Sequence, residues 1–121
     1  MSNPDSCVGL VPYFKIAPGK TAEFKALTTR FIAKTRSEPK CVYYAFSFDG
    51  DTAHCREGYD DAAAVLVHLE NVGALLGEVL QISEITRLEL HGPAAEIEKL
   101  REPVAAFKPQ LFALEPGGLR R

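Results

Sequence analysis

The sequence predicts an α+β fold in which helices cover one face of an antiparallel sheet. Four segments are rich in β-forming residues or alternate between apolar and polar residues, as strands do. Apolar residues at helical spacing follow the first and the third of these segments. The resulting order, β-α-β-β-α-β, is the split βαβ, ferredoxin-like arrangement, and its two crossover helices should lie on the same face of the sheet.

The first strand and the first helix are expected in the N-terminal third of the chain. Residues 7–16 are rich in β formers, although Pro12 cannot donate to a ladder and therefore indicates an edge position or a bulge. After a turn, Thr21 is a suitable N-cap, and apolar residues then recur at helical spacing. The helix is predicted to stop at Glu38-Pro39, because proline disfavours helical backbone in the residue before it.

The next two strands are predicted to form a hairpin. Residues 41–48 give the strongest strand signal in the chain, and the Asp-Gly pair in residues 49–51 favours a tight turn into a strand that begins at Thr52. Asp60 and Asp61 then supply an N-cap and a first-turn acid for the second helix, and both suit its positive end.

The second half of the sequence predicts shorter helices and strands. The second helix should break or bend near residues 71–73, and a short helical piece over residues 74–80 follows. Residues 82–91 alternate as a strand. Pro93 suits the first position of a further helix, and residues 108–114 predict a final strand that its proline keeps to an edge.

The length of 121 residues corresponds to one domain. We expect a flexible N-terminus over residues 1–6, a single domain over residues 7–115 and a flexible tail over residues 116–121. The N-terminus lacks the basic and apolar regions of a signal peptide, and no apolar run approaches the roughly 18 residues of a spanning helix. Three cysteines, an odd number, favour reduced thiols and a cytoplasmic location.

Charge and ligand spacing exclude several classes of partner. The net charge of −2 gives no reason to expect nucleic acid or an anionic membrane. A metal site is not expected, because His54 and Cys55 are adjacent on a strand and point to opposite faces.

The strand over residues 41–48 is apolar on both faces. An antiparallel strand with one solvated face normally shows a polar set of residues there. We therefore predict a homodimer in which two sheets pack face to face and close a barrel-like interior, since a large apolar surface is unusual on a soluble monomer. The two sets are Val42, Tyr44, Phe46 and Phe48 on one side, and Cys41, Tyr43 and Ala45 on the other.

Three short segments carry a family resemblance. They are R-E-G-Y-D-D over residues 56–61, the helical His68-Leu69-Glu70, and L-E-L-H-G-P over residues 88–93. With the order of elements over residues 8–114, they resemble the antibiotic biosynthesis monooxygenase (ABM) domain family. The resemblance implies a dimeric α+β barrel with a small pocket between the sheet and the helices of each subunit. Members include cofactor-independent oxygenases of aromatic polyketides, haem-degrading enzymes, and isomerases or lyases of small signal molecules.

The chain departs from two branches of that family. It has no tryptophan, on which the haem-degrading and polyketide-oxidising branches rely. Pro12 and Tyr13 stand in the first strand, where the haem-degrading branch has an asparagine. Haem degradation is therefore not expected, and the residues of the polyketide-type mechanism cannot be transferred one by one.

His68 is the main candidate for a reactive residue, because it borders the apolar side of the second helix. An imidazole with a pKa near 6.5 is a suitable general base at neutral pH. Oxygenation without a cofactor also needs a group that stabilises an oxyanion, and the candidates are Arg56, Arg87 and Asn71. The alternative is a structural histidine bonded to the backbone.

Aromatic side chains and one cation are the candidates for substrate binding. Tyr43 and Tyr44 are adjacent on a strand, so at most one of them faces a pocket. Aromatic side chains also dominate sheet cores and dimer interfaces, which is the alternative for most of them. The candidates for substrate binding are Tyr13, Tyr44, Phe46 and Arg87.

The sequence leaves three functions open. The first is a cofactor-independent monooxygenase that acts on a small aromatic or conjugated molecule, with His68 as the base. The second is a binding or stress-related module that has the same pocket and no chemistry. The third is an isomerase or lyase, which would consume no oxygen. We expect no cofactor.

Overall fold

The computed structural model describes residues 3–121. The predicted flexible N-terminus begins with residues 1–2, which lie outside the described residues. The elements of the chain in order are β1 (Asn3–Pro4), β2 (Val8–Ile16), α1 (Thr21–Thr35), β3 (Cys41–Asp49), β4 (Thr52–Tyr59), α2 (Ala62–Asn71), α3 (Gly73–Val79), β5 (Ser83–Gly92), α4 (Ala94–Leu100), the 3-10 turn η1 (Ala105–Phe107), β6 (Gln110–Ala113) and β7 (Leu119–Arg120).

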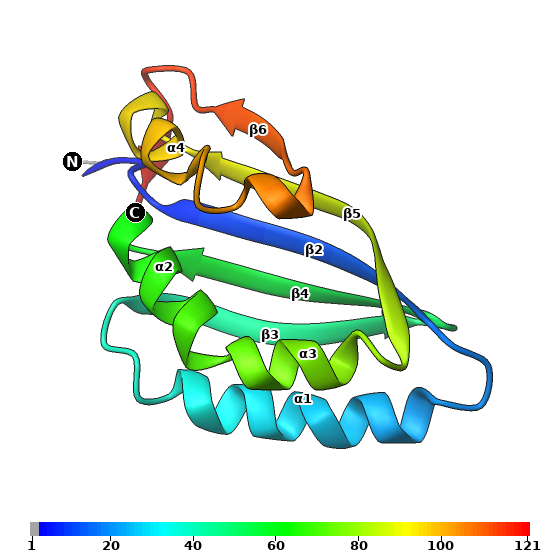
Figure 1. Ribbon diagram of the computed structural model, residues 1–121. Coiled ribbons are helices and arrows are strands. Elements are labelled where there is room, and N and C mark those ends of the chain that lie inside the picture. The colour runs from blue at the N-terminus through cyan, green and yellow to red at the C-terminus, as the bar shows by residue number, and fades with distance from the viewer. Residues whose placement is uncertain (1–2) are drawn as a thin grey trace.

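The main sheet has five strands in the order β3-β4-β2-β5-β6. The first four pair antiparallel, and β6 joins β5 in parallel at the edge. Figure 1 shows α1, α2 and α3 beside β3 and β4, with α4 near β5 and β6. The predicted β-α-β-β-α-β order is confirmed, and the last strand lies at an edge as its proline required.

Short local signals set the ends of the elements. Gly50 takes φ of 60° in the turn between β3 and β4, a conformation that glycine adopts without strain. The Asp61 side chain accepts a hydrogen bond of 2.8 Å from the Ala64 N–H and caps α2. Val72 separates α2 from α3, which meet at a bend of 63°. The N-cap of α1 is Lys20, so Thr21 is its first helical residue rather than the predicted cap.

The core lies between the sheet and the helices in two clusters. One cluster joins β2, β4 and β5 to α2 and α4, and the other joins β2 and β4 to α1 and α3. Phe24 and Phe31 on α1 meet Phe46 on β3 with edge-to-face geometry, which is favoured for aromatic pairs. The largest fully buried side chains are Tyr59, Phe24, Ile16, Leu75, Leu90 and Leu100.

Two bulges change the faces that simple alternation predicts. The register of β3 against β4 shifts between Cys41 and Tyr43, so Cys41 packs on the core while Val42 is exposed. The register of β2 against β5 shifts between Tyr13 and Phe14, opposite Thr86. The predicted grouping of Val42 with Tyr44, Phe46 and Phe48 on one side of β3 is therefore wrong.

Within residues 3–121 no helix covers the second face of the sheet, which we call the open face. Tyr13 stacks on His54 with ring centroids 4.5 Å apart, and His91 stacks on Phe112 at 4.6 Å. Arg56 lies over the ring of Tyr43 at 4.6 Å. The open face therefore carries aromatic and charged side chains in contact with one another.

The two ends of the described chain lie together. β1 and β7 form a short antiparallel ladder, so residues 119–120 of the tail pair with residues 3–4. In the described part of the chain no single helix is long and apolar enough to cross a membrane; α2 and α3 reach such a length only together, across their bend.

Candidate active site

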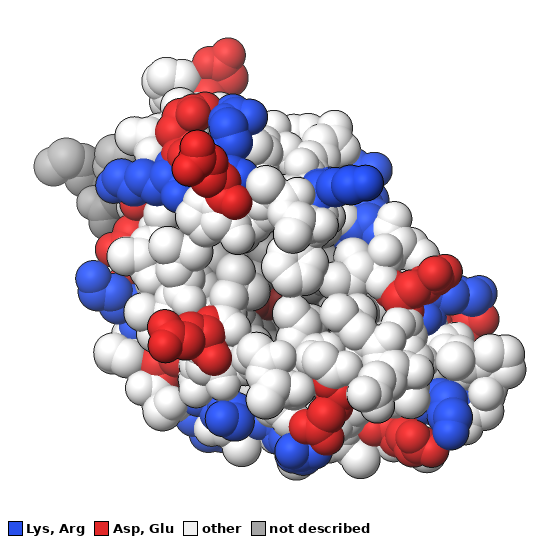
Figure 2. All heavy atoms as spheres, in the orientation of Figure 1, with Lys and Arg blue, Asp and Glu red and all other residues white. Residues whose placement is uncertain are grey.

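A cavity lies between the inner face of the sheet and the helices. Its volume is about 60 Å³, counted over the positions that the centre of a water molecule can take, which is room for several waters or part of a ligand. Figure 2 shows a hollow bordered by uncharged side chains, with an acidic group visible inside it. The acidic side chain of the wall is Glu57, and the wall also contains His68. Most of the wall is apolar, including Phe24, Phe31, Tyr44, Phe46, Leu76 and Phe107.

His68 reaches the cavity from α2, whose apolar side faces the core, and only 2% of it is exposed. Its Nδ1 lies 2.9 Å from Oε2 of Glu38, and its Nε2 lies 3.4 Å from Oε1 of Glu57. With Glu38 as a carboxylate, which only accepts hydrogen bonds, Nδ1 is the donor and Nε2 faces Glu57. Both ring nitrogens thus meet carboxyl groups rather than backbone.

Glu57 occupies an inward position of β4, between Cys55 and Tyr59 in the alternation that faces the helices. The Tyr59 hydroxyl donates a hydrogen bond of 2.6 Å to its Oε1. Burial raises the pKa of Glu57 from 4.5 to about 8, although the bond from Tyr59 acts in the opposite direction. The carboxyl is therefore mostly protonated at pH 7.

The imidazole of His68 is held neutral by the same environment. Burial lowers its pKa, and the hydrogen bond to Glu38 acts against that effect. The rings of Tyr44 and Tyr59 lie 5.1 and 5.2 Å from the imidazole and help to exclude water from it. A neutral base and a neutral acid thus face each other at the cavity wall.

Glu38 is fixed by Asn71 from the end of α2. The Asn71 amide donates a hydrogen bond of 2.8 Å to Oε2 of Glu38. It donates a second one of 3.0 Å to the carbonyl of Lys34, near the end of α1. Asn71 therefore ties α1, the loop that follows it and α2 together. Its amide is engaged with Glu38 and Lys34 and does not line the cavity, which differs from the predicted oxyanion donor.

Three of the predicted site residues line the cavity, namely His68, Tyr44 and Phe46. Tyr44 and Phe46 contact each other edge to face at 5.6 Å, and burial raises the pKa of Tyr44, which keeps its hydroxyl neutral. The register of β3 turns Tyr43 to the open face, in agreement with the prediction that only one of the two tyrosines faces the pocket.

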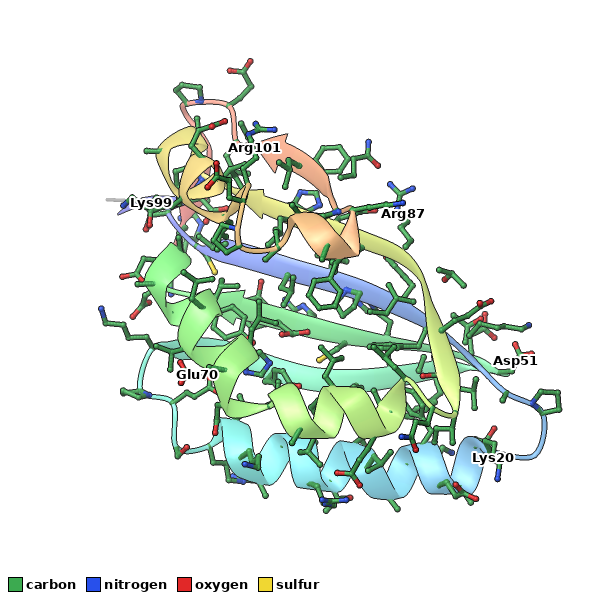
Figure 3. The ribbon with its side chains drawn as sticks, viewed as in Figure 1. Lys20, Asp51, Glu70, Arg87, Lys99 and Arg101 are labelled. Atoms are coloured by element: carbon green, nitrogen blue, oxygen red, sulfur yellow. The ribbon has the colours of Figure 1, made fainter. Side chains whose placement is uncertain are left out.

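The other three predicted residues lie on the open face, which corrects their placement. Arg56 alternates with the inward Cys55 and Glu57 and packs on Tyr43. Tyr13 stacks on His54. The bulge opposite Thr86 turns Arg87 outward, where it binds Glu89 and donates 3.0 Å to Gln110. Figure 3 shows Arg87 at the edge of the molecule, away from α2.

Sequence reasoning missed Glu38 and Glu57. Glu57 carries a usable signal, because strict alternation in β4 puts it on the same face as the apolar Ala53 and Cys55. Glu38 carries none, since its place before Pro39 indicates only the end of a helix. It meets His68 from 30 positions away in the sequence.

Among the described residues that form the wall, none is lysine or arginine, so its polar chemistry comes from a carboxyl, an imidazole, hydroxyl groups and the thiol of Cys55. Within residues 3–121 no group of three His, Cys, Asp or Glu side chains is arranged to hold a metal ion. The arrangement can give a proton from Glu57 and accept one at His68 in an apolar surrounding.

The chain has the ABM-like α+β fold, which it shares with a solved antibiotic biosynthesis monooxygenase. MupZ from Pseudomonas fluorescens is 45% identical, with a TM-score of 0.91 and 96% of each chain covered. The chain therefore belongs to the family of MupZ.

Other solved structures share the fold at lower identity. An antibiotic biosynthesis monooxygenase is 22% identical with a TM-score of 0.62, covering 69% of this chain and 94% of its own. A protein of Caulobacter crescentus CB15 is 25% identical with a TM-score of 0.53, covering 61% of this chain and 78% of its own. No protein-family model and no curated protein sequence matches the chain.

Proposed function

We propose that the protein is an enzyme that performs acid–base catalysis on a small, neutral, largely apolar organic molecule without a cofactor. The observation that supports this best is the protonated carboxyl of Glu57 next to the neutral Nε2 of His68, 3.4 Å away, at the wall of an apolar cavity. Groups whose pKa is displaced toward neutrality are suited to proton transfer at physiological pH.

The two residues have complementary roles. Nε2 of His68 accepts a proton from carbon or hydroxyl of the substrate, while Glu38 at Nδ1 stabilises the imidazolium that forms. Glu57 donates its proton to a carbonyl or hydroxyl oxygen that gains negative charge. The electrons of the substrate are rearranged without an oxidant, so the reaction class is an isomerisation or an elimination.

The wall restricts the kind of substrate. A substrate carboxylate or phosphate would lie in an apolar surrounding without a cation to compensate it, which is costly. Phe24, Phe31, Tyr44 and Phe46 offer aromatic surface instead. A neutral aromatic or conjugated carbonyl compound fits these features.

Oxygenation is the second candidate, and the likeness of the fold to antibiotic biosynthesis monooxygenases favours it. His68 would deprotonate a phenol or enol, and the electron-rich anion would itself reduce dioxygen. The protonated Glu57 can donate a hydrogen bond to the oxyanion, the role predicted from the sequence for Arg56, Arg87 or Asn71.

Two assays, each with its own set of compounds, separate these functions. Oxygen uptake is measured with hydroxyquinols, anthrones and catechols, and deuterium incorporation from heavy water is measured with conjugated ketones. Glu57→Gln and His68→Ala should abolish whichever activity the wild type shows, while Arg56→Ala on the open face should retain that activity. Deuterium incorporation without oxygen uptake supports the first candidate, and uptake supports the second. A compound of either set that raises the melting temperature without turnover would indicate a binding module and contradict both.

We also propose that two copies pair through the open face. The aromatic and charged contacts of Tyr13, Tyr43, Arg56 and Arg87 lie there, so these residues are interface rather than site residues in this proposal. Light scattering at micromolar protein should give twice the chain mass of 13.3 kDa. A mass of one chain would reject the dimer.

A further inference from the structure

A surface groove runs beside the cavity on the outer side of α2. It lies between the end of α1 and α2, and Lys34, Glu38, Glu70 and Asn71 line it. Glu70 is exposed, and Figure 3 labels it beside α2. Glu38 lines this groove although only 8% of the residue is exposed.

Glu38, His68 and Glu57 form a continuous line from this groove to the cavity. Glu38 borders the groove and contacts Nδ1 of His68 at 2.9 Å. The opposite ring nitrogen lies 3.4 Å from Glu57, which borders the cavity. Asn71 also borders the groove and binds Glu38, but its amide does not carry protons between groups.

We infer that Glu38 is a positioning residue that exchanges protons between the groove and the pair His68–Glu57, so that the acid equilibrates with solvent while a substrate fills the cavity. This inference rests on the proposed function of the pair. In one step Glu57 gives its proton to Nε2 of His68, and the Nδ1 proton passes to the carboxylate of Glu38, where it exchanges with water in the groove. The reverse step returns the imidazole to its first tautomer, and no electrons are transferred.

The other titratable groups around the imidazole do not offer a competing route. Tyr59 and Cys55 on β4 are buried and Tyr44 on β3 is half-buried, and loss of solvent raises the pKa of each, so all three stay neutral near pH 7. β2 and β5 contribute Leu10, Pro12 and Leu88 to this part of the wall, which do not titrate.

The test measures the exchange of the His68 imidazole proton with water by NMR in ¹⁵N-labelled protein, without substrate. Glu38→Gln keeps an oxygen that accepts from Nδ1 but cannot pass a proton on. Exchange should slow about tenfold or more. Glu57→Gln should also slow exchange, because the Nδ1 proton leaves the neutral ring when Nε2 receives one from Glu57. If Glu38 had a purely structural role, its replacement would weaken the packing around His68, and exchange in the variant would be faster.

Asn71→Ala is the matched control, since it removes a partner of Glu38 and leaves the carboxyl in place. Its exchange should equal or exceed the wild-type rate. If Glu38→Gln does not fold, Glu38→Asp keeps the charge and draws the carboxyl back from Nδ1, so exchange should again slow. Unchanged or faster exchange in the folded Glu38 variant would overturn the inference. Because no turnover is measured, this result is independent of whether Glu57→Gln abolishes catalysis.

Discussion

The buried carboxyl of Glu57 should make stability depend on pH in a window where few other groups titrate. The pKa of Glu57 is about 8 in the folded protein, against 4.5 for a glutamate that is exposed to water in the unfolded chain. Between these values the native protein binds more protons than the unfolded chain, so the free energy of unfolding falls as pH rises. His68 has a lowered pKa, and its contribution to stability rises with pH up to its unfolded value of 6.5. The two effects oppose each other below pH 6.5, and only Glu57 remains above it.

The magnitude follows from the width of that window. From pH 6.5 to 8 is about 1.5 pH units, and each unit of a fully displaced proton corresponds to about 1.36 kcal/mol. The wild type should therefore lose up to about 2 kcal/mol of unfolding free energy between these two pH values.

Urea denaturation at pH 6.5 and 8 measures this loss, with Glu57→Gln as the matched variant. Glutamine has nearly the same shape and does not titrate, so its stability should be almost flat over the window. Other titrating groups are shared by both proteins and cancel in the difference. An equal pH slope in the two proteins would refute the assignment of a protonated Glu57.

Three further predictions concern packing, capping and thiol burial. Phe24→Ala, at a fully buried position, should lower the unfolding free energy in urea denaturation by about 3–5 kcal/mol. Phe107→Ala, at an exposed position, should lower it far less, and equal losses in the two variants would contradict the burial of Phe24. Asp61→Ala should cost about 1 kcal/mol by the same measurement, because it removes the cap of α2, and the neighbouring exposed Asp60→Ala should cost almost nothing. The buried Cys55 should resist maleimide in the native protein while the half-buried Cys7 reacts, and mass spectrometry of labelled peptides showing equal labelling of these two thiols would contradict its burial.

The sequence predicted the fold well because its local signals agree with each other. The Asp-Gly turn, the acidic cap before α2 and the bend at Val72 all depend on neighbours in the chain. The structure has the turn and the bend where the pattern placed them, and the cap one residue later, at Asp61 instead of Asp60. The face of the sheet on which each side chain lies was less predictable, since a single bulge at Thr86 turns the Arg87 side chain to the other face.

The site could be predicted only in part, because its chemistry depends on long-range contacts. His68 could be recognised from the apolar side of one helix. Its two partners come from the loop after α1 and from β4, and no local pattern brings them together. The raised pKa of Glu57 results from the assembled core and is not a property of its neighbours in the chain.

Folding alone does not explain a carboxyl at position 57. Glu57 lowers stability above pH 6.5 by the linkage described above, and an amide of the same shape would accept the bond from Tyr59 without that penalty. The feature that glutamine would lack is a proton that can leave. Glu57→Gln should therefore be more stable than the wild type at pH 8 and inactive in the turnover assays, a combination that a purely structural glutamate would not produce.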